Sequence, residues 1–179
     1  MDSFYTRDEL KLLGLKAVGE NVSLSRKASI YDPDEIELGH HVRIDDFCIL
    51  SGKVGIGSFV HIAAYTALYG QKGIYIDDYS GLSPRCTVLS ASDDFSGNYL
   101  MMPTVDVRFR NVTGGSVYIK KYAAIGTSCV IFPSVVIEEG VAVGAMSLIN
   151  KTLPAWRIYA GIPAKYVKER SRKLLDFLQ

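Results

Sequence analysis

The 179-residue sequence has almost no net charge, and this lack excludes several classes of protein. Twenty Lys and Arg residues face nineteen Asp and Glu residues, which gives a formal net charge of +1. A protein that binds nucleic acid or a membrane surface through its overall charge is expected to be strongly basic. Long apolar runs are also missing, since none reaches the roughly 18 residues that a membrane-spanning helix requires. We therefore predict a protein with no nucleic-acid partner and no membrane span.

Cysteine is scarce, and its spacing follows neither a disulfide nor a metal-binding pattern. Cys48, Cys86 and Cys129 are an odd number without a CxxC pair, which argues against a disulfide framework or a zinc site. The N-terminal stretch MDSFYTRDELKLLG has no long apolar core, so we do not expect a secretory signal. These features predict a single-domain protein of the reducing cytoplasm.

A six-residue repeat dominates the sequence from Val18 onward. Each repeat begins with Leu, Ile or Val, and the next position is mostly small or turn-forming, as at Gly39, Asp45, Gly126 and Gly144. A period of six suits neither an α-helix nor simple strand alternation. It matches the hexapeptide β-helix repeat, in which short strands are joined by tight corners. The eighteen lead positions are Val18, Leu24, Ile30, Leu38, Ile44, Leu50, Ile56, Ile62, Leu68, Ile76, Leu82, Val88, Ile119, Ile125, Ile131, Ile137, Val143 and Ile149.

Three hexads make one triangular coil, so eighteen hexads predict about six coils. The insertions follow the third hexad of a coil, with eight-residue steps after Ile30 and Leu68 and a long break after Val88. We predict one mostly β domain, with a parallel β-helix over 18–155 and an excursion loop over 89–118. The three cysteines occupy equivalent places in second hexads. We interpret them as small core residues, with a functional thiol as the alternative.

The two ends of the chain are predicted to be helical. Residues 1–17 contain a capping box, TRDE, and should form a helical cap over the open end of the prism. Residues 156–179 should form an extension followed by a helix after Pro163. The apolar side of that helix would consist of Val167, Leu174, Leu175 and Leu178. Its basic residues form either a solvated face or a docking surface for a polyanionic ligand.

The repeat and the tail VGAMSLINKTLPAWRIYAGIPAKYVKE resemble the left-handed β-helix, hexapeptide-repeat acyltransferases. The chain is most similar to the bacterial sugar acetyltransferases of surface-polysaccharide and O-antigen clusters, in the galactoside/maltose acetyltransferase group. Members typically end in IGAGSxVTKDIPPxxxxxGxPAKxI. The resemblance implies a left-handed β-helix, a homotrimer with active sites between subunits, and acetyl-CoA as acyl donor without a metal.

The resemblance also implies which residues contact the cofactor. Small side chains at Gly144 and Ala145 let the backbone approach the pantetheine closely. Lysines in the tail reach the nucleotide phosphates as point charges rather than as bidentate donors. Asn150 departs from the threonine of the family pattern. The implied cofactor-contacting residues are Thr127, Gly144, Ala145, Asn150, Lys151, Lys165 and Lys168.

The stretch VLSASDDFSG opens the loop without the histidine that the resemblance would place there. In galactoside-type members that imidazole takes a proton from the sugar hydroxyl. The matching place here is Asp94, with Asp93 beside it. An aspartate, with an ordinary pKa of about 3.9, is a poor base for a hydroxyl, whereas an amine needs less help. We therefore predict Asp93 and Asp94 as catalytic residues that act on the amino group of a nucleotide-linked 4-amino-4,6-dideoxyhexose. A solvated turn is the alternative interpretation.

Other candidates keep further functions open. His61 is a third candidate catalytic residue, and as a base it would favour O-acetylation of a sugar hydroxyl; it is otherwise structural. Arg108 and Arg110 either bind the phosphates of the substrate or are simply exposed. A metal-dependent hydrating enzyme would need three converging histidines, and a purely structural β-helix would need neither the loop nor the basic tail. Both of these rivals are disfavoured.

Overall fold

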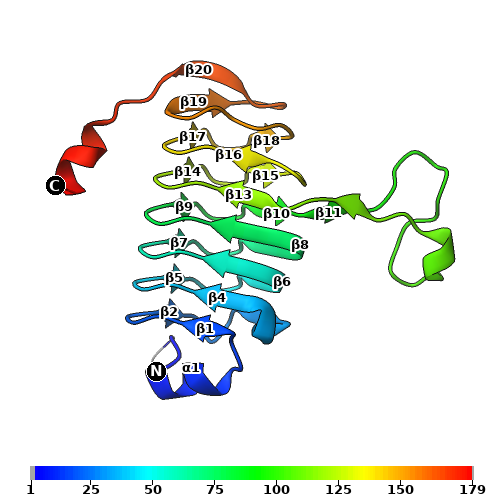
Figure 1. Cartoon of the computed structure of the whole chain (residues 1–179), viewed down its shortest axis with the longest axis horizontal. Coiled ribbons are helices and arrows are strands. Elements are labelled where there is room, and N and C mark those ends of the chain that lie inside the picture. The colour runs from blue at the N-terminus through cyan, green and yellow to red at the C-terminus, as the bar shows by residue number, and fades with distance from the viewer. Residues whose placement is uncertain (1–2, 179) are drawn as a thin grey trace.

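The structure, a computed structural model, describes residues 3–178 and consists of parallel coils stacked into a triangular prism (Figure 1). The first face holds β1 (Ala17–Val18), β4 (Ile36–Leu38), the later parts of β6 (Ile49–Ile56) and β8 (Ala67–Ile76), β13 (Val117–Ile119) and β16 (Val136–Ile137). The second face holds β2 (Ser23–Leu24), β5 (Arg43–Ile44), β7 (His61–Ile62), β9 (Gly81–Leu82), β14 (Ala124–Ile125), β17 (Ala142–Val143) and β19 (Arg157–Ala160). The third face holds β3 (Ser29–Tyr31), the early parts of β6 and β8, β10 (Thr87–Leu89), β15 (Val130–Ile131) and β18 (Leu148–Ile149). Short 3₁₀ turns lie at η1 (Pro33–Glu35), η2 (Val107–Phe109) and η3 (Lys173–Leu178).

The lead residues of the repeat form the core of the prism. Sixteen of the eighteen predicted lead side chains are buried, and the two exceptions, Val18 and Ile30, belong to the lowest coil. Leads of successive coils lie in register, as Ile44 does with Ile62. Each coil therefore buries its apolar side chains against its neighbours, as stacked repeats do. The prediction of a left-handed parallel β-helix is confirmed, and β19 extends the stack one layer beyond the six predicted coils.

One corner of the prism carries a ladder of aromatic rings. Phe59, Tyr79 and Tyr122 all adopt a left-handed backbone conformation, with φ between 57° and 62°. Such a conformation costs an L-residue roughly 1–2 kcal/mol. The rings stack on one another, with centroids 4.8 Å apart for Phe59 and Tyr79 and 5.7 Å apart for Tyr79 and Tyr122. This stacking offsets part of the backbone strain at each corner.

The three cysteines are free and buried in the core, as the interpretation of them as core residues requires. Each Sγ donates to a backbone carbonyl at 3.2 Å, Cys48 to Ala63, Cys86 to Gly126 and Cys129 to Gly144. Burial raises the pKa of the Cys48 thiol to about 11. This thiol is therefore protonated near neutral pH and is a weak nucleophile.

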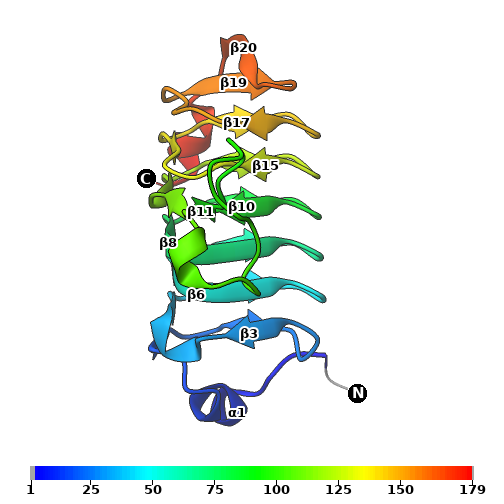
Figure 2. The same ribbon diagram turned by 90° about the vertical axis from the view of Figure 1, so that its right-hand side faces the viewer.

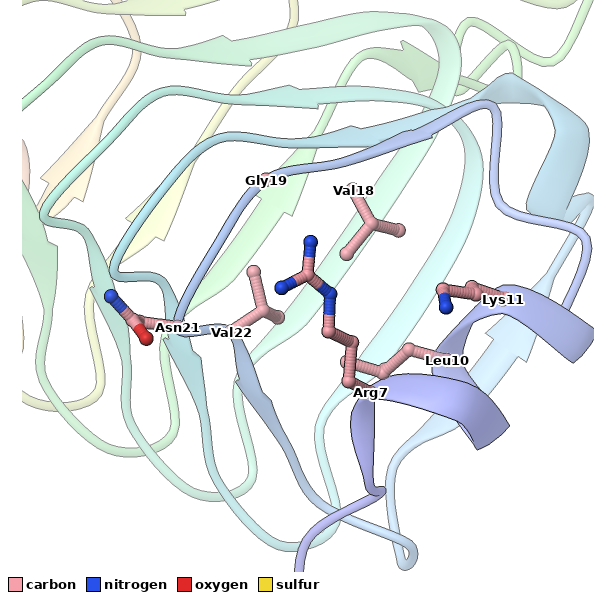
Figure 3. A pocket seen from close by; sticks show the side chains of 7 residues that line it. All are labelled: Arg7, Leu10, Lys11, Val18, Gly19, Asn21 and Val22. Atoms are coloured by element: carbon pink, nitrogen blue, oxygen red, sulfur yellow. The ribbon is translucent and has the colours of Figure 1, made fainter.

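The lower end of the prism is covered by the N-terminal segment. Helix α1 (Arg7–Leu12) begins with the predicted capping box, in which Thr6 and Glu9 each bond the backbone of the other. Leu10 of α1 is buried against the lowest coil. Figure 3 shows the Arg7 side chain beneath the strand that carries Val18, where a cavity of about 240 Å³ remains. This cavity lies at the opposite end of the prism from the C-terminal tail, and we assign it to packing of the cap.

The upper end of the prism departs in part from the prediction: the segment directly after Pro163 is a strand, and the predicted C-terminal helix is limited to the short η3. Residues Lys165–Glu169 form β20, which pairs antiparallel with β19. The open upper edge of the second face offers unpaired backbone groups, and a returning strand satisfies them, whereas a helix would not. Val167, predicted on an apolar helix side, is 55% exposed. Lys165 and Lys168 therefore lie on a strand, and only the short η3 follows.

The excursion loop leaves the prism after β10 as a separate arm. Strands β11 (Ala91–Ser92) and β12 (Thr113–Gly114) pair antiparallel at its root. Beyond them the chain projects away from the stacked coils (Figure 1), and in the turned view the arm lies in front of the coils, toward the viewer (Figure 2). We define the arm as residues 91–114. Within residues 3–178, no helix is long and apolar enough to cross a membrane.

Candidate active site

The second face presents a vertical row of outward-facing positions whose side chains are bulky in the lower coils and small from Gly81 to Ala142. In register along this row lie Arg43, His61, Gly81, Ala124 and Ala142. These residues precede the buried leads, so their side chains point away from the core. The lower half of the row is polar and bulky, whereas the upper half has almost no side chains. An extended ligand could therefore approach the backbone closely over the upper coils.

His61 is part of a hydrogen-bonded chain in the lower half of the row. Its Nε2 lies 2.7 Å from Oδ2 of Asp45, and Oδ1 of Asp45 accepts a hydrogen bond from Arg43 Nε at 2.7 Å. Burial alone would raise the pKa of the Asp45 carboxyl, yet the hydrogen bonds from His61 and Arg43 outweigh it and hold that pKa below its usual value. Asp45 is thus ionised and accepts from His61 Nε2, which leaves Nδ1 of the imidazole available.

Two cavities open on the second face and meet at Gly81. The first, of about 180 Å³, is lined by His61, Ala63, Gly81, Leu82, Ser83 and Pro84. The second, of about 420 Å³, is lined by Tyr79, Ser80, Gly81, Tyr122, Ala123, Ala124, Arg170 and Leu174. His61 and Ser83 therefore share one depression, and the C-terminal tail forms a wall of the other. We call the two cavities together the second-face groove.

The first aspartate of the predicted pair, Asp93, occupies the root of the arm beside Arg110. Asp93 Oδ1 lies 3.8 Å from a terminal nitrogen of Arg110, and the two side chains are 27% and 21% exposed. Oδ1 of Asp93 and Nε of Arg110 are both buried, and neither finds a hydrogen-bond partner among residues 3–178. A buried carboxylate oxygen without a donor is costly. It is therefore a natural place for a ligand that brings an N–H group.

The second aspartate, Asp94, is used by the loop itself. Its Oδ1 accepts hydrogen bonds from the backbone N–H and the hydroxyl of Ser96, and its Oδ2 accepts one from Asn111 Nδ2 at 3.2 Å. These bonds, first of all that from the Ser96 hydroxyl, lower the pKa of Asp94. A lowered pKa and occupied oxygens make the Asp94 carboxylate a poor base. The alternative interpretation as a turn therefore suits Asp94 better than Asp93.

The two predicted phosphate-binding arginines differ in the same way. Arg108 forms a bidentate pair with Asp106, with Nε 3.1 Å and a terminal nitrogen 2.9 Å from the carboxylate oxygens. This guanidinium already has its counter-charge within the arm. Arg110 faces Asp93 instead. Neither arginine forms an exposed cluster of the kind that grips a diphosphate.

The predicted cofactor-contacting residues fall into separate groups. Thr127 and Ala145 lie at the corner that follows the second face, where the Thr127 hydroxyl donates to the Pro84 carbonyl at 2.7 Å. A Cβ on Gly144 would lie 3.0 Å from the Ala160 Cβ, so its small size also serves coil stacking. Asn150 and Lys151 are exposed at the far end of β18, across the third face. Lys165 and Lys168 are exposed on β20 above the groove.

Sequence reasoning missed three residues that shape the groove, namely Gly81, Ser83 and Arg170. The first two stand in SGLSP, around the lead Leu82, at outward positions of a regular hexad. That placement was a signal for Gly81 and Ser83, because outward positions of a β-helix line its surface grooves. Arg170 gave no such signal, since its contacts depend on the path of the tail. His61 and Asp93 were both predicted, but within one chain they lie on different parts of the molecule, β7 and the arm.

The chemistry of the groove does not include a preformed metal centre. Within the described residues, no group of three or more His, Cys, Asp or Glu side chains is placed to hold a metal ion. A stacked β-helix with a groove of small residues, an excursion arm and an ion-paired carboxylate is typical of acyl transfer from a long, slender donor. These features define the class of hexapeptide-repeat acyltransferases.

Comparison with known proteins identifies the branch of this class. Profiles of protein families give no match. The chain is 42% identical over 171 residues, 94% of its length, to dTDP-4-amino-4,6-dideoxy-D-glucose acyltransferase of Escherichia coli, of which it covers 89%. It is 27% identical over 142 residues, 73% of its length, to an E. coli K12 protein assigned to lipopolysaccharide biosynthesis as an O-acetyl transferase, of which it covers 67%.

A solved relative agrees over nearly the whole chain. The crystal structure of AntD, an N-acyltransferase from Bacillus cereus, in complex with dTDP and 3-hydroxybutyryl-CoA is 54% identical, with a TM-score of 0.97. The match covers 99% of this chain and 95% of AntD. Crystal structures also exist of AntD variants in which a serine, or an aspartate ten positions after it, is replaced. The chain belongs to the hexapeptide-repeat acyltransferase family, in the branch of dTDP-4-amino-4,6-dideoxyglucose acyltransferase.

Proposed function

We propose that this acyltransferase moves an acyl group from acyl-CoA, in the simplest case acetyl-CoA, to the 4-amino group of a dTDP-linked 4-amino-4,6-dideoxyglucose. The observation that carries the proposal is the buried, unpartnered carboxylate oxygen of Asp93 at the root of the arm. The names of two relatives support the same substrate class, since AntD was crystallised with dTDP-4-amino-4,6-dideoxyglucose and CoA, and the E. coli relative bears that sugar in its name.

The reaction proceeds by attack of the neutral sugar amine on the thioester carbonyl. A C–N bond forms, and the resulting tetrahedral intermediate carries the negative charge on the former carbonyl oxygen. Asp93 accepts the proton from the amine nitrogen. The C–S bond then breaks as the carbonyl reforms, and the thiolate of CoA takes up the proton. Arg110 lies 3.8 Å from the Asp93 carboxylate and orients it toward the incoming amine.

Ser83 is the second residue that we place in the reaction. The serine and the aspartate replaced in the AntD variants lie ten positions apart, and so do Ser83 and Asp93 in this chain. Ser83 lines the smaller cavity of the second-face groove. A hydroxyl there would donate to the oxyanion as it develops, which is the kind of interaction that accelerates acyl transfer.

Ser83 and Asp93 can act together only if two subunits meet. Within one chain Ser83 lies on the second face, whereas Asp93 lies on the arm, which projects away from the prism (Figure 1). We therefore propose a homotrimer in which the arm of one subunit reaches the second-face groove of the next. The arm supports this assembly because it exposes apolar side chains, among them Phe95 and Val107 at 79% and 77%.

The proposal extends to the location of the protein and to the use of its product. Three free, buried thiols fit a reducing cytoplasm, where we place the protein. Likeness to a protein of lipopolysaccharide biosynthesis supports a role for the acylated sugar in surface polysaccharide such as O-antigen.

A second candidate function, O-acetylation of a sugar hydroxyl, is favoured by one observation. The Asp45–His61 pair leaves an imidazole nitrogen free beside Ser83, and imidazole is the better base for a hydroxyl. The two functions are separated by a thiol-release assay with acetyl-CoA or 3-hydroxybutyryl-CoA. We expect turnover with dTDP-4-amino-4,6-dideoxyglucose and none with dTDP-glucose. Turnover with dTDP-glucose alone, abolished by His61→Ala, would establish the second function instead.

A further inference from the structure

Gly81 is a glycine that the fold of the single chain does not require. Its φ lies outside the left-handed region, and an added Cβ would have only the His61 carbonyl oxygen, at 3.7 Å, within 4 Å. The eight other glycines of the chain whose φ is not left-handed behave differently. In each of them an added Cβ would lie between 2.4 and 3.2 Å from a neighbouring atom. Coil stacking therefore explains those glycines, but it does not explain Gly81.

The position of Gly81 in the groove gives a reason for a glycine there. Both cavities of the second-face groove are lined by this residue, which is the point where they join. Ala124 lies directly above it in register, and Ala142 lies above Ala124. The floor of the groove is thus made of backbone and methyl groups only. Any side chain at position 81 would stand between the two cavities and narrow the passage from one to the other.

The outer wall of the larger cavity is firmly fixed. One terminal nitrogen of Arg170 donates to the carbonyl oxygens of Tyr122, Gly140 and Val141 at 2.7, 3.0 and 3.2 Å. The guanidinium of Arg172 lies 5.1 Å from the centre of the Trp156 ring. These contacts hold the tail against the aromatic corner, so that Leu174 faces the groove. The groove is therefore an open depression that the tail bounds on one side.

We propose that position 81 is free of a side chain so that the pantetheine arm of acyl-CoA can cross the second face there. The arm would run from the cavity walled by the tail to the cavity that contains Ser83, and it would deliver the thioester to that hydroxyl. Gly81 is then a residue that the chain requires for binding the donor. This inference rests on the proposed function, because it takes acyl-CoA as the donor.

The test uses the variants Gly81→Ala and Gly81→Val in the full-length protein, with the KM for each substrate measured separately. We expect the KM for acetyl-CoA to rise about threefold for alanine and tenfold or more for valine, because a misplaced reactive group is strongly penalised. The KM for the dTDP-sugar should stay within about twofold, because that substrate binds from the arm side. The unfolding temperature should not fall, because the chain leaves room for the added atoms.

Two matched controls separate blockage from general damage. Gly126→Ala places a Cβ 2.6 Å from the Ala145 nitrogen, so it should lower the unfolding temperature. Ala17→Val adds bulk to an exposed position of β1, outside the groove, and should change neither kinetics nor stability. An unaltered KM for acetyl-CoA in Gly81→Val would overturn the inference. Loss of the oligomer in that variant, seen by sedimentation velocity, would also overturn it, since Gly81 would then serve subunit packing.

Failure of the inference can be told apart from failure of the proposed function. If the unmodified protein does not turn over the dTDP-sugar, the proposed function is wrong. Binding of CoA itself, measured by calorimetry, still tests Gly81 in that case. Weaker CoA binding in Gly81→Val would support the inference, and equal binding would refute it.

Discussion

The prism of this protein buries its apolar side chains, whereas the arm leaves many of its own exposed. In the prism, all lead residues above the lowest coil are buried against the coils below and above. In the arm, Phe95, Val107 and Met102 are exposed by 79%, 77% and 62%. The arm also holds both buried polar atoms that lack a hydrogen-bond partner in residues 3–178, Asp93 Oδ1 and Arg110 Nε. The prism therefore buries its apolar side chains within the single chain, whereas the arm leaves apolar surface exposed and these polar atoms without partners.

This difference indicates that the arm, rather than the prism, contacts the substrate and a neighbouring subunit. A stack of coils gains stability from the contacts of each added layer with its neighbours, and it needs no partner outside the chain. The arm exposes apolar surface and keeps an unsatisfied carboxylate, both of which cost free energy in isolation. Proteins keep such unfavourable features at binding sites. In this arm we assign them to binding of the sugar amine and of a neighbouring subunit.

The largest effect is expected for Asp93→Asn at the root of the arm. Removing the proton acceptor should lower kcat by about 10²–10⁴, while the neighbouring Asp94→Asn, which keeps a carbonyl oxygen for Ser96, should lower it less than about tenfold. Steady-state kinetics with acetyl-CoA and the dTDP-linked amino sugar provide the measurement. A reversed order of the two variants would show that Asp94, not Asp93, serves the reaction.

A pair of leucines compares the two regions directly in stability. Leu50 is fully buried in β6, and Leu100 in the arm is 55% exposed. Leu50→Ala should lower the free energy of unfolding by about 2–5 kcal/mol, whereas Leu100→Ala should change it by less than about 0.5 kcal/mol. Denaturant titration followed by circular dichroism measures both. Equal losses for the two variants would mean that the arm packs into the core of the assembly and would weaken the contrast.

A smaller effect is expected when the exposed apolar side chains of the arm become polar. The double change Phe95→Ser and Val107→Ser should shift the proposed trimer toward monomer without loss of β-structure, because the prism does not depend on these side chains. Sedimentation velocity over a range of concentrations measures the shift. Activity should fall in parallel with the trimer, since the site is shared between subunits. A monomer that retained full activity would contradict a shared site.

The smallest effect concerns pH and the cap at the lower end. Hydrogen bonds from Arg26 and from Thr6 lower the pKa of Glu9 to about 2. A lowered pKa in the folded state contributes stability above the pKa of the unfolded chain, near 4.5. That stability is lost as the pH falls from about 4.5 toward 2.

The variant Glu9→Gln tests this pH dependence. It should lower the unfolding temperature slightly at pH 7 and have a much smaller effect near pH 2, where most of the stability from the Glu9 charge is already lost. Thermal unfolding at the two pH values is the measurement. Equal shifts at both would assign the effect to packing rather than to charge.

The repeat made most of the fold predictable, because its information is local. Leads such as Ile44 and Ile62 bury against the equivalent residue of the next coil, so a period of six alone places them. The break after Val88 likewise predicted where the arm begins. The tail was different, because the choice between helix and strand at Lys165–Glu169 depended on the open edge above β17 and β19. The six-residue period of the sequence does not predict where such an unpaired edge lies.

The candidate site was predictable only in part, for the same reason. The sequence indicated a carboxylate pair at the start of the loop, but two adjacent aspartates look alike in a sequence. Ser96 and Asn111 engage Asp94, and Arg110 faces Asp93. These partners come from the far strand of the arm or from its turn, so only the folded loop distinguishes the two carboxylates.

The sequence by itself thus determined the β-helix, its capping box, the position of the arm and the class of chemistry. It did so because each of these depends on residues within one hexad or one motif. Only the folded chain shows that the tail forms a strand and a wall of the groove, that within residues 3–178 Asp93 Oδ1 lacks a hydrogen-bond partner whereas both oxygens of Asp94 have one, and that Gly81 lines two cavities. Each of these depends on which distant segments meet, and stacking brings together residues that the chain separates by a whole coil or more.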